Sequence, residues 1–165
     1  MILESLNVRE SSYVLLRAVE ADIPAIVELM QNDAIRKADF DVDHESSARY
    51  LKAFRAIDAD PAHLLVVAVD DARRVVGTMQ LTVLPGLARA GATRLQIEAV
   101  RVDETLRGNG LGSTMINWAI AEGKRRGVKL VQLTSDASRK DAHRFYERLG
   151  FTASHVGFKL RITGE

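Results

Sequence analysis

Three glycines within five residues mark the part of the sequence best suited to binding a phosphate. They are Gly108, Gly110 and Gly112, and the run Arg-Gly-Asn-Gly-Leu-Gly that contains them begins at Arg107. Glycine lets a backbone approach a ligand closely and turn successive N–H groups toward it. The first amides of a helix have no partner within the helix and carry partial positive charge. A helix beginning here would suit a pyrophosphate, and a flexible turn is the alternative.

Two other kinds of phosphate loop fit this segment poorly. A Walker loop ends in Gly-Lys-Ser/Thr, whereas Gly112, Ser113 and Thr114 follow one another here without a lysine. A dinucleotide-binding loop would have glycine at position 113 and would open directly from a strand, but residues 103–106 intervene. A nucleotide-dependent enzyme is therefore an alternative that these residues support less well.

Two further side chains could take part in proton transfer. Tyr146 carries a phenol whose ordinary pKa is about 10, so it is protonated at neutral pH and can donate. Its spacing also suits a helix on which it would pack beside Phe145 and Leu149, and packing is the alternative. Glu98 lies in an expected strand, on the face away from its apolar neighbours, and could act as a base. A solvated glutamate is the alternative there.

Local patterns predict the elements that would position these groups. Apolar runs and alternation predict strands, and they cover residues 13–19, 64–69, 75–84, 95–102, 130–134 and 158–162. Helical spacing and capping signals predict helices that follow Asp22, cover 46–57, run from the glycine loop to about Arg126, and cover 141–149. Residues 33–45 are expected to form a loop or broken helix, and 85–92 a loop. This order predicts one mixed α/β domain over residues 1–165, with hairpins early and a crossover late.

Composition excludes several classes of function. The chain has 165 residues, 47% of them hydrophobic and 27% charged, as in a globular domain. The absence of cysteine excludes disulfides and thiolate chemistry, and the four histidines lack metal-ligand spacing, so we expect no metal. A net charge of +1 with intermixed signs does not indicate nucleic-acid binding. With neither a signal-like N-terminus nor a membrane-length apolar run, we expect a cytoplasmic protein that does not bind membranes.

Two motifs together resemble signatures of the GNAT acetyltransferase superfamily. Val100-Arg101-Val102, a short spacer and Arg107-x-x-Gly110-x-Gly112 resemble its acyl-CoA-binding motif. The run from Ala142 to Phe151, which contains Tyr146 and ends in Leu-Gly-Phe, resembles its second signature. The early strand and helix pair resemble its N-terminal part, so the resemblance covers nearly the whole chain.

The resemblance implies the GNAT fold, of α/β (α+β) class, with a mixed central sheet whose splayed parallel strands are flanked by helices. It implies acetyl-CoA as cosubstrate, with the pantetheine arm between strands 95–102 and 130–134, paired to the backbone of Val100 and Val102. The implied cofactor-binding residues are Val100, Arg101, Val102, Arg107, Gly108, Asn109, Gly110, Leu111, Gly112, Ser113, Ser138, Arg139 and Tyr146. One departure concerns Arg139, which stands where the family often has asparagine. Either Ser138 replaces that amide contact or Arg139 reaches a phosphate.

The resemblance also implies a reaction, which is direct transfer of the acetyl group to an amine through a ternary complex. Tyr146 would protonate the departing thiolate, Glu98 would act as the base, and a backbone N–H near Val100 would meet the oxyanion. The acceptor is an unidentified small molecule or peptide, and residues 33–45 and 85–92 would shape its site. A catalytically idle acyl-CoA-binding or sensor module of the same fold is the alternative. A homodimer, the commonest soluble assembly, is the first assembly to test.

Overall fold

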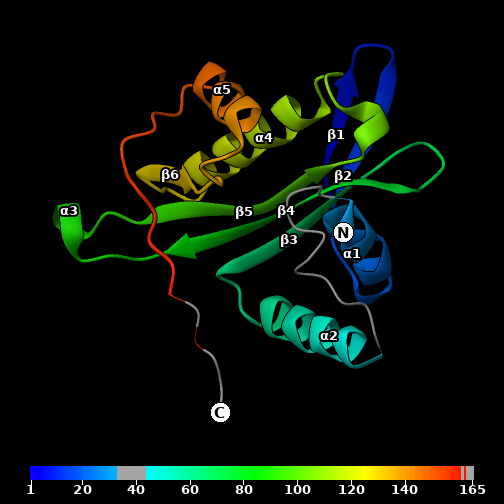
Figure 1. Ribbon diagram of the computed structural model, residues 1–165, viewed down its shortest axis with the longest axis horizontal. Coiled ribbons are helices and arrows are strands. Elements are labelled where there is room, and N and C mark those ends of the chain that lie inside the picture. Colours follow the sequence, from blue (N-terminus) through cyan, green and yellow to red (C-terminus); the bar gives the residue numbers. More distant parts are fainter. Residues whose placement is uncertain (33–43, 161, 163–165) are drawn as a thin grey trace. The chain divides into compact units, whose positions relative to one another are not determined.

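The computed structural model describes residues 1–32, 44–160 and 162, and its centre is a six-stranded sheet in the order β1-β2-β3-β4-β5-β6 (Figure 1). The strands are β1 Ile2–Val8, β2 Ser11–Arg17, β3 His63–Val69, β4 Val75–Leu84, β5 Arg94–Val102 and β6 Leu130–Leu133. Neighbouring strands from β1 to β5 pair antiparallel. Most of the sheet is thus antiparallel, in agreement with the hairpins predicted for the early part of the chain.

The last strand, β6, is parallel to its neighbour β5, unlike the antiparallel pairs before it. The backbone N–H of Lys129 donates to the Thr93 carbonyl at 2.8 Å, and three residues further along each strand the Gln132 amide donates to Gln96 Oε1 at 2.5 Å. Because both pairs advance together, β6 lies parallel to β5. The expected mixed sheet with splayed parallel strands is confirmed.

Four helices and three single turns connect the strands in the described part of the chain. The helices are α1 Ile23–Gln31, α2 His44–Ala59, α4 Leu111–Arg125 and α5 Lys140–Arg148, and the turns are η1 Glu20–Asp22, α3 Ala88–Gly91 and η3 Glu104–Leu106. Pro24 lies in the first turn of α1, where its missing N–H costs nothing. Basic residues end α4, which suits the negative end of its dipole. Each predicted helix is therefore present to within two or three residues.

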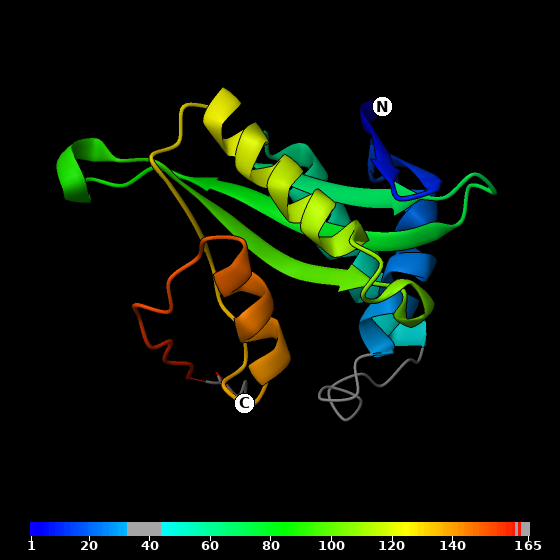
Figure 2. The same cartoon turned by 90° about the horizontal axis from the view of Figure 1, so that it is seen from above.

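Helices cover both faces of the sheet, with α4 on one and α1 and α2 on the other (Figure 2). Under α4, Leu95 and Ile97 of β5 are almost wholly buried with Met115. Leu95 Cδ2 lies 3.2 Å from the point a Cβ on Gly123 would occupy, so the helix backbone comes very close to β5. On the opposite face, Phe54 of α2 and the apolar side of α1 form a second cluster with Val67.

Three predictions need correction. The strand β1 was not predicted, because only Leu6 and Val8 of it are buried and its turn lacks the usual glycine or asparagine. The strand predicted at 158–162 is wrong, since the described residues there have no regular structure and Phe158 is 94% exposed. A strand needs backbone hydrogen bonds from a neighbour, so alternation alone was insufficient. The predicted burial of the strand at 130–134 is also wrong, because Leu130 is exposed.

The chain divides into two compact units, Met1–Gln132 and Leu133–Glu165, and each is described by itself. Most of the expected loop or broken helix at 33–45 lies outside the described residues, which resume at His44 with the start of α2. No helix in the described ranges is long and apolar enough to cross a membrane.

Candidate active site

A bulge interrupts β5 in the middle of the sheet. Gln80 of β4 pairs with Glu98, and Thr78 of β4 pairs with Arg101. The two residues Ala99 and Val100 therefore lie opposite one residue of β4, the one between Thr78 and Gln80. Ala99 has φ +50°, in the left-handed region that alanine rarely adopts. Such a conformation costs roughly 1–3 kcal/mol and is concentrated at functional sites. The bulge therefore indicates a constraint on β5 beyond sheet formation.

Arg101 fastens the backbone next to this bulge. Its Nη1 donates to the carbonyl oxygen of Val100 at 2.7 Å, in a part-buried position. A bulge leaves a residue outside the ladder, so a side chain that bonds to its carbonyl helps to fix the new backbone direction. Val100, Arg101 and Val102, which the sequence predicts to contact the cofactor arm, thus follow directly on the bulge.

Glu98 lies immediately before the bulge and is exposed in the middle of a central strand. Its polar neighbours continue on the same face, because directly paired residues share a face of a sheet. We call this set the polar row, and it consists of Arg94, Gln96 and Glu98 on β5, Gln80 and Thr82 on β4, His63 on β3 and Gln132 on β6.

Cross-strand bonds join the polar row. His63 Nδ1 lies 2.9 Å from Thr82 Oγ1, and Gln132 donates to Gln96 at 2.5 Å. Leu65, which is opposite Gln80, packs against the cluster formed by α1 and α2. The polar row is consequently on the α1/α2 face of the sheet, while α4 covers the other face.

The glycine loop is built by a sequence of local turns. Asp103 accepts from the Thr105 hydroxyl at 2.6 Å and from its N–H at 2.9 Å, and these two bonds lower the pKa of the Asp103 carboxyl. Gly108 follows at φ +78° and Gly110 at φ +100°, so both positions favour glycine. Gly110 is the N-cap of α4, and its carbonyl accepts from Thr114 N at 3.0 Å.

The first turn of α4 fits the phosphate role that the sequence predicts for this loop. It contains Leu111, Gly112 and Ser113, whose amides belong to the set that an α-helix cannot pair internally. With fifteen residues, α4 is long enough to carry a full dipole. Asn109 is half-buried and Arg107 is exposed at the loop's start. These donors suit the pyrophosphate of acetyl-CoA.

The hairpin that was not predicted supports this loop from behind. Arg9, in the turn between β1 and β2, places Nη2 3.4 Å from the Gly108 carbonyl oxygen. Val8 Cγ1 lies 3.4 Å from the point a Cβ on Gly110 would occupy. No local sequence pattern connects residues 8 and 9 with residues 108 and 110, so these contacts could not be predicted from the sequence.

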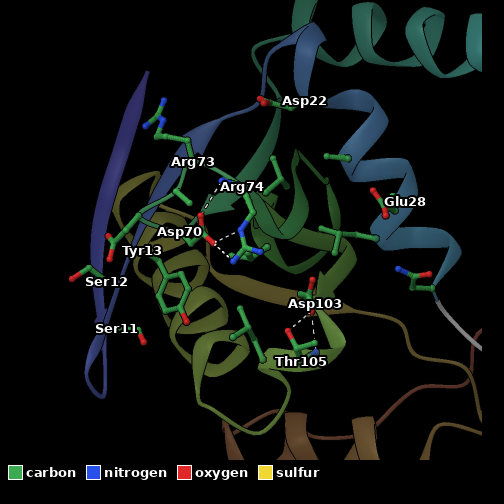
Figure 3. Close-up of a pocket in the computed structure, with 18 of the residues that line it drawn as sticks. Ser11, Ser12, Tyr13, Asp22, Glu28, Asp70, Arg73, Arg74, Asp103 and Thr105 are labelled. Atoms are coloured by element: carbon green, nitrogen blue, oxygen red, sulfur yellow. Dashed lines mark hydrogen bonds and ion pairs between the residues drawn. The ribbon is translucent and has the colours of Figure 1, made fainter.

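A cleft of about 830 Å³ lies where the loop begins, and it is lined by α1, the start of β2, the β3–β4 turn, and Asp103, Thr105 and Leu106 (Figure 3). Arg74 Nε donates to Asp70 Oδ2 at 2.8 Å, and the Arg74 N–H donates to Oδ1 at 2.9 Å. These bonds lower the pKa of the Asp70 carboxyl, the backbone bond most strongly, and the Arg74 charge also lowers that of Asp103. These bonds fix the shape of the β3–β4 turn, and the Arg74 charge acts on Asp103, the residue before η3.

The second unit contains the other predicted site residues. Tyr146 is half-buried on α5, and its ring meets Phe145 and Phe151 edge-on at centroid distances of 5.1 and 5.9 Å. Arg139 is the N-cap of α5. Ser138 Oγ donates to Asp136 Oδ1 at 2.6 Å, which leaves its oxygen able to accept a bond but commits its proton locally.

The two histidines of the second unit make local contacts. His143 on α5 bonds through Nε2 to the Asp136 carbonyl at 2.8 Å, and His155 Nδ1 lies 2.7 Å from Ser154 Oγ. Within the same residues, no three His, Asp or Glu side chains gather closely enough to hold a metal ion.

A protein family model and a solved structure both match most of this chain. The family model described as "Acetyltransferase (GNAT) family" matches residues 27–151. The structure is similar to a crystal structure of a transcriptional regulator from Bacillus halodurans C-125, with 37% identity and a TM-score of 0.86, over 91% of this chain and 99% of that one.

Two curated proteins match shorter segments. An aminoalkylphosphonate N-acetyltransferase of Salmonella typhimurium is 38% identical over 63 residues, which is 38% of this chain and 41% of that protein. A glucosamine 6-phosphate N-acetyltransferase of Trypanosoma brucei brucei is 39% identical over 89 residues, which is 54% of this chain and 58% of that protein. The chain thus spans about half the length of these curated relatives.

Proposed function

Because the chain belongs to the GNAT acetyltransferase family, we propose that it transfers the acetyl group of acetyl-CoA to an amine by direct transfer through a ternary complex. The observation that carries this proposal is the bulge in β5. It joins an exposed carboxylate, Glu98, to a strained backbone at Ala99, and β5 then leads within ten residues to a glycine loop at the start of α4. Neither sheet stability nor core packing requires this combination.

In the proposed reaction, the amine nitrogen attacks the thioester carbonyl carbon, a C–N bond forms, and the C–S bond breaks. Glu98 accepts the proton that the amine loses, directly or through one water molecule. A backbone N–H beside Val100 donates to the oxyanion of the tetrahedral intermediate. Tyr146 donates its phenolic proton to the departing thiolate, which leaves as the CoA thiol.

The proposed cofactor contacts divide by the part of acetyl-CoA that they would meet. Arg107 and the amides of Gly108 to Ser113 would bind the pyrophosphate. The backbone of Val100 and Val102 would pair with the pantetheine arm in the manner of an added strand. Ser138 and Arg139, at the start of α5, would supply the polar contact that an asparagine often makes in the family.

The acceptor is proposed to be a primary amine on a polar molecule. The polar row lies on the face that Glu98 shares, and its amide and hydroxyl groups suit hydrogen-bonding acceptors better than apolar ones. The two curated relatives are named for amines that also carry a phosphonate or a phosphate. A small polar amine is therefore the first class to assay.

The alternative is an acyl-CoA-binding sensor without catalytic activity. It is favoured by one observation, the resemblance over 91% of the chain to a protein described as a transcriptional regulator. Binding alone would need the glycine loop and the strand backbone but neither Glu98 nor Tyr146.

The test is mass-spectrometric detection of acetylated product from acetyl-CoA and a panel of amines, amino sugars, polyamines and peptide N-termini. The Gly110→Asp variant is the control, because it adds a Cβ at φ +100° and a negative charge where the phosphates would bind. Product in the wild type and its loss in Gly110→Asp support the enzyme. Tight CoA binding without any acetylated amine would instead support the sensor.

A further inference from the structure

Arg94 is the one cationic residue of the polar row, and it lies at the opposite end of β5 from the glycine loop. It is the first residue of β5 and pairs with Leu84, the last residue of β4. Its Nη1 is 3.8 Å from the point a Cβ on Gly86 would occupy, so the guanidinium lies against the loop between β4 and β5. The whole residue is half-buried.

One donor of this guanidinium is buried without a partner. Arg94 Nε is shielded from solvent and has no hydrogen-bond partner in the described part of the chain. A charged donor that is removed from water and has no hydrogen-bond partner costs free energy, so such donors usually bond to an acceptor of the protein, a water molecule or a ligand. A planar guanidinium is best satisfied by the paired oxygens of a phosphate, phosphonate or carboxylate.

The cofactor's phosphates are an unsuitable partner for Arg94. From Arg94 to Val102, where β5 leads into the glycine loop, there are eight residue steps, or roughly 27 Å at the rise of an antiparallel strand. No group of the described residues bonds to Arg94 Nε either, so another molecule is the expected source of the anion. The acceptor is the reactant expected on this face.

The register places Arg94 in line with the proposed base. Arg94, Gln96 and Glu98 alternate along β5 and so face the same side, while Leu95 and Ile97 between them are buried under α4. Four residue steps separate Arg94 from Glu98, which is roughly 13 Å between their Cα atoms. Gln96, midway, is held by Gln132 at 2.5 Å. The strand thus presents a carboxylate beside the bulge, an amide, and then a guanidinium.

We propose that Arg94 forms an anion subsite for the acceptor, so that the substrate is a primary amine carrying a phosphate, phosphonate or carboxylate. This inference rests on the proposed function, in which Glu98 marks the amine end of the acceptor. The amine lies near Glu98, the anionic group bonds to the Arg94 guanidinium, and the body of the molecule lies over Gln96. Arg94 selects the substrate and takes no part in proton transfer.

The experiment compares matched acceptors in Arg94→Gln, Arg94→Lys and wild-type protein. The acceptors are 2-aminoethylphosphonate, β-alanine and ethanolamine, together with glucosamine 6-phosphate and glucosamine. Arg94→Gln is expected to lower kcat/KM for the anionic amines by roughly 10–100-fold, through KM, since a bond to a charged group is lost. Its effect on the neutral amines and on the KM of acetyl-CoA is expected to stay within about twofold. Arg94→Lys should retain part of the effect, because it keeps the charge and loses the fork.

Arg125→Gln is the matched control, since Arg125 is an exposed arginine in the last turn of α4, which covers the face of the sheet away from the polar row. It should leave every acceptor unchanged. Whichever anionic amine shows the largest Arg94 dependence identifies the anionic group. Equal losses for anionic and neutral amines, or no loss for either, would overturn the subsite.

A binding measurement separates failure of this inference from failure of the proposed function. Calorimetric titration of inorganic phosphate into protein saturated with CoA, whose own phosphates then fill the glycine loop, should show binding that Arg94→Gln abolishes. Wild-type protein that acetylates neutral amines but binds no phosphate contradicts the subsite alone. Wild-type protein that acetylates no amine contradicts the proposed function, and phosphate binding lost in Arg94→Gln would then still support an anion site.

Discussion

The two faces of β5 carry opposite chemistry within nine residues. On one face, Leu95 and Ile97 are excluded from solvent beneath α4. On the other face, Arg94, Gln96 and Glu98 are half-buried or exposed and join polar groups of the neighbouring strands. A central strand in an antiparallel sheet can stabilise the fold through one face alone. We infer that the face under α4 maintains the fold, which leaves the polar row for substrate.

The largest expected effect tests whether chemistry can be lost while the fold is kept. Tyr146→Phe removes one hydroxyl and retains the ring that meets Phe145 and Phe151. If the phenol protonates the thiolate, kcat should fall by roughly 10²–10⁴-fold with little change in Tm or in CoA affinity. Steady-state kinetics with calorimetry of CoA binding would measure this. Full turnover in the variant would remove Tyr146 from the reaction.

A substitution on the apolar face of β5 should lower stability and leave catalysis nearly unchanged. Leu95→Ala leaves a cavity beneath Gly123, and it should lower the free energy of unfolding by about 2–5 kcal/mol. At a temperature where the variant is folded, kcat/KM per folded molecule should stay within a few-fold of the wild type. Chemical denaturation and kinetics on the same preparation would check this. A large fall in kcat/KM without loss of stability would show that the two faces are not separable.

The smallest expected effect concerns the turn that leads out of β5. Asp103 has a lowered pKa in the folded protein, because the Thr105 hydroxyl and N–H donate to it and Arg74 and Arg107 lie nearby. A lowered folded pKa means that the stabilisation is present above the unfolded pKa of about 4 and is lost as pH falls through the folded value. Asp103→Asn should therefore be less stable than wild type near pH 7, and the gap in Tm should narrow in acid. A gap of constant size from pH 7 to 3 would contradict the assignment.

How much of this could be predicted from the sequence depends on the range of the interactions. The glycine loop and the start of α4 follow from residues adjacent in the chain, so local patterns located them. The contact of Arg9 with Gly108 joins residues 99 positions apart, and no local pattern records it. The same limit explains the strand wrongly predicted at 158–162, because an alternating apolar pattern does not tell whether a neighbouring strand is present to pair with it.

The bulge in β5 left a signal that can be read in the sequence. Polar residues occur at 94, 96 and 98, and the next is Arg101, so the alternation changes phase between Glu98 and Arg101. One inserted residue accounts for that change. No glycine marks the spot, because Ala99 adopts the left-handed conformation without one.

The central claim is that the polar face of β5 is the reactive face, and Glu98→Gln tests it most directly. The substitution keeps the size of the side chain and removes its basicity, and Glu104→Gln, a nearby exposed carboxylate in η3, is the control. We predict that kcat/KM for an amine acceptor falls by roughly 10²-fold near pH 7 in Glu98→Gln, and less as the pH approaches the amine's own pKa, with CoA affinity unchanged. A pH–rate profile that matches those of wild type and Glu104→Gln in shape and height would contradict the claim.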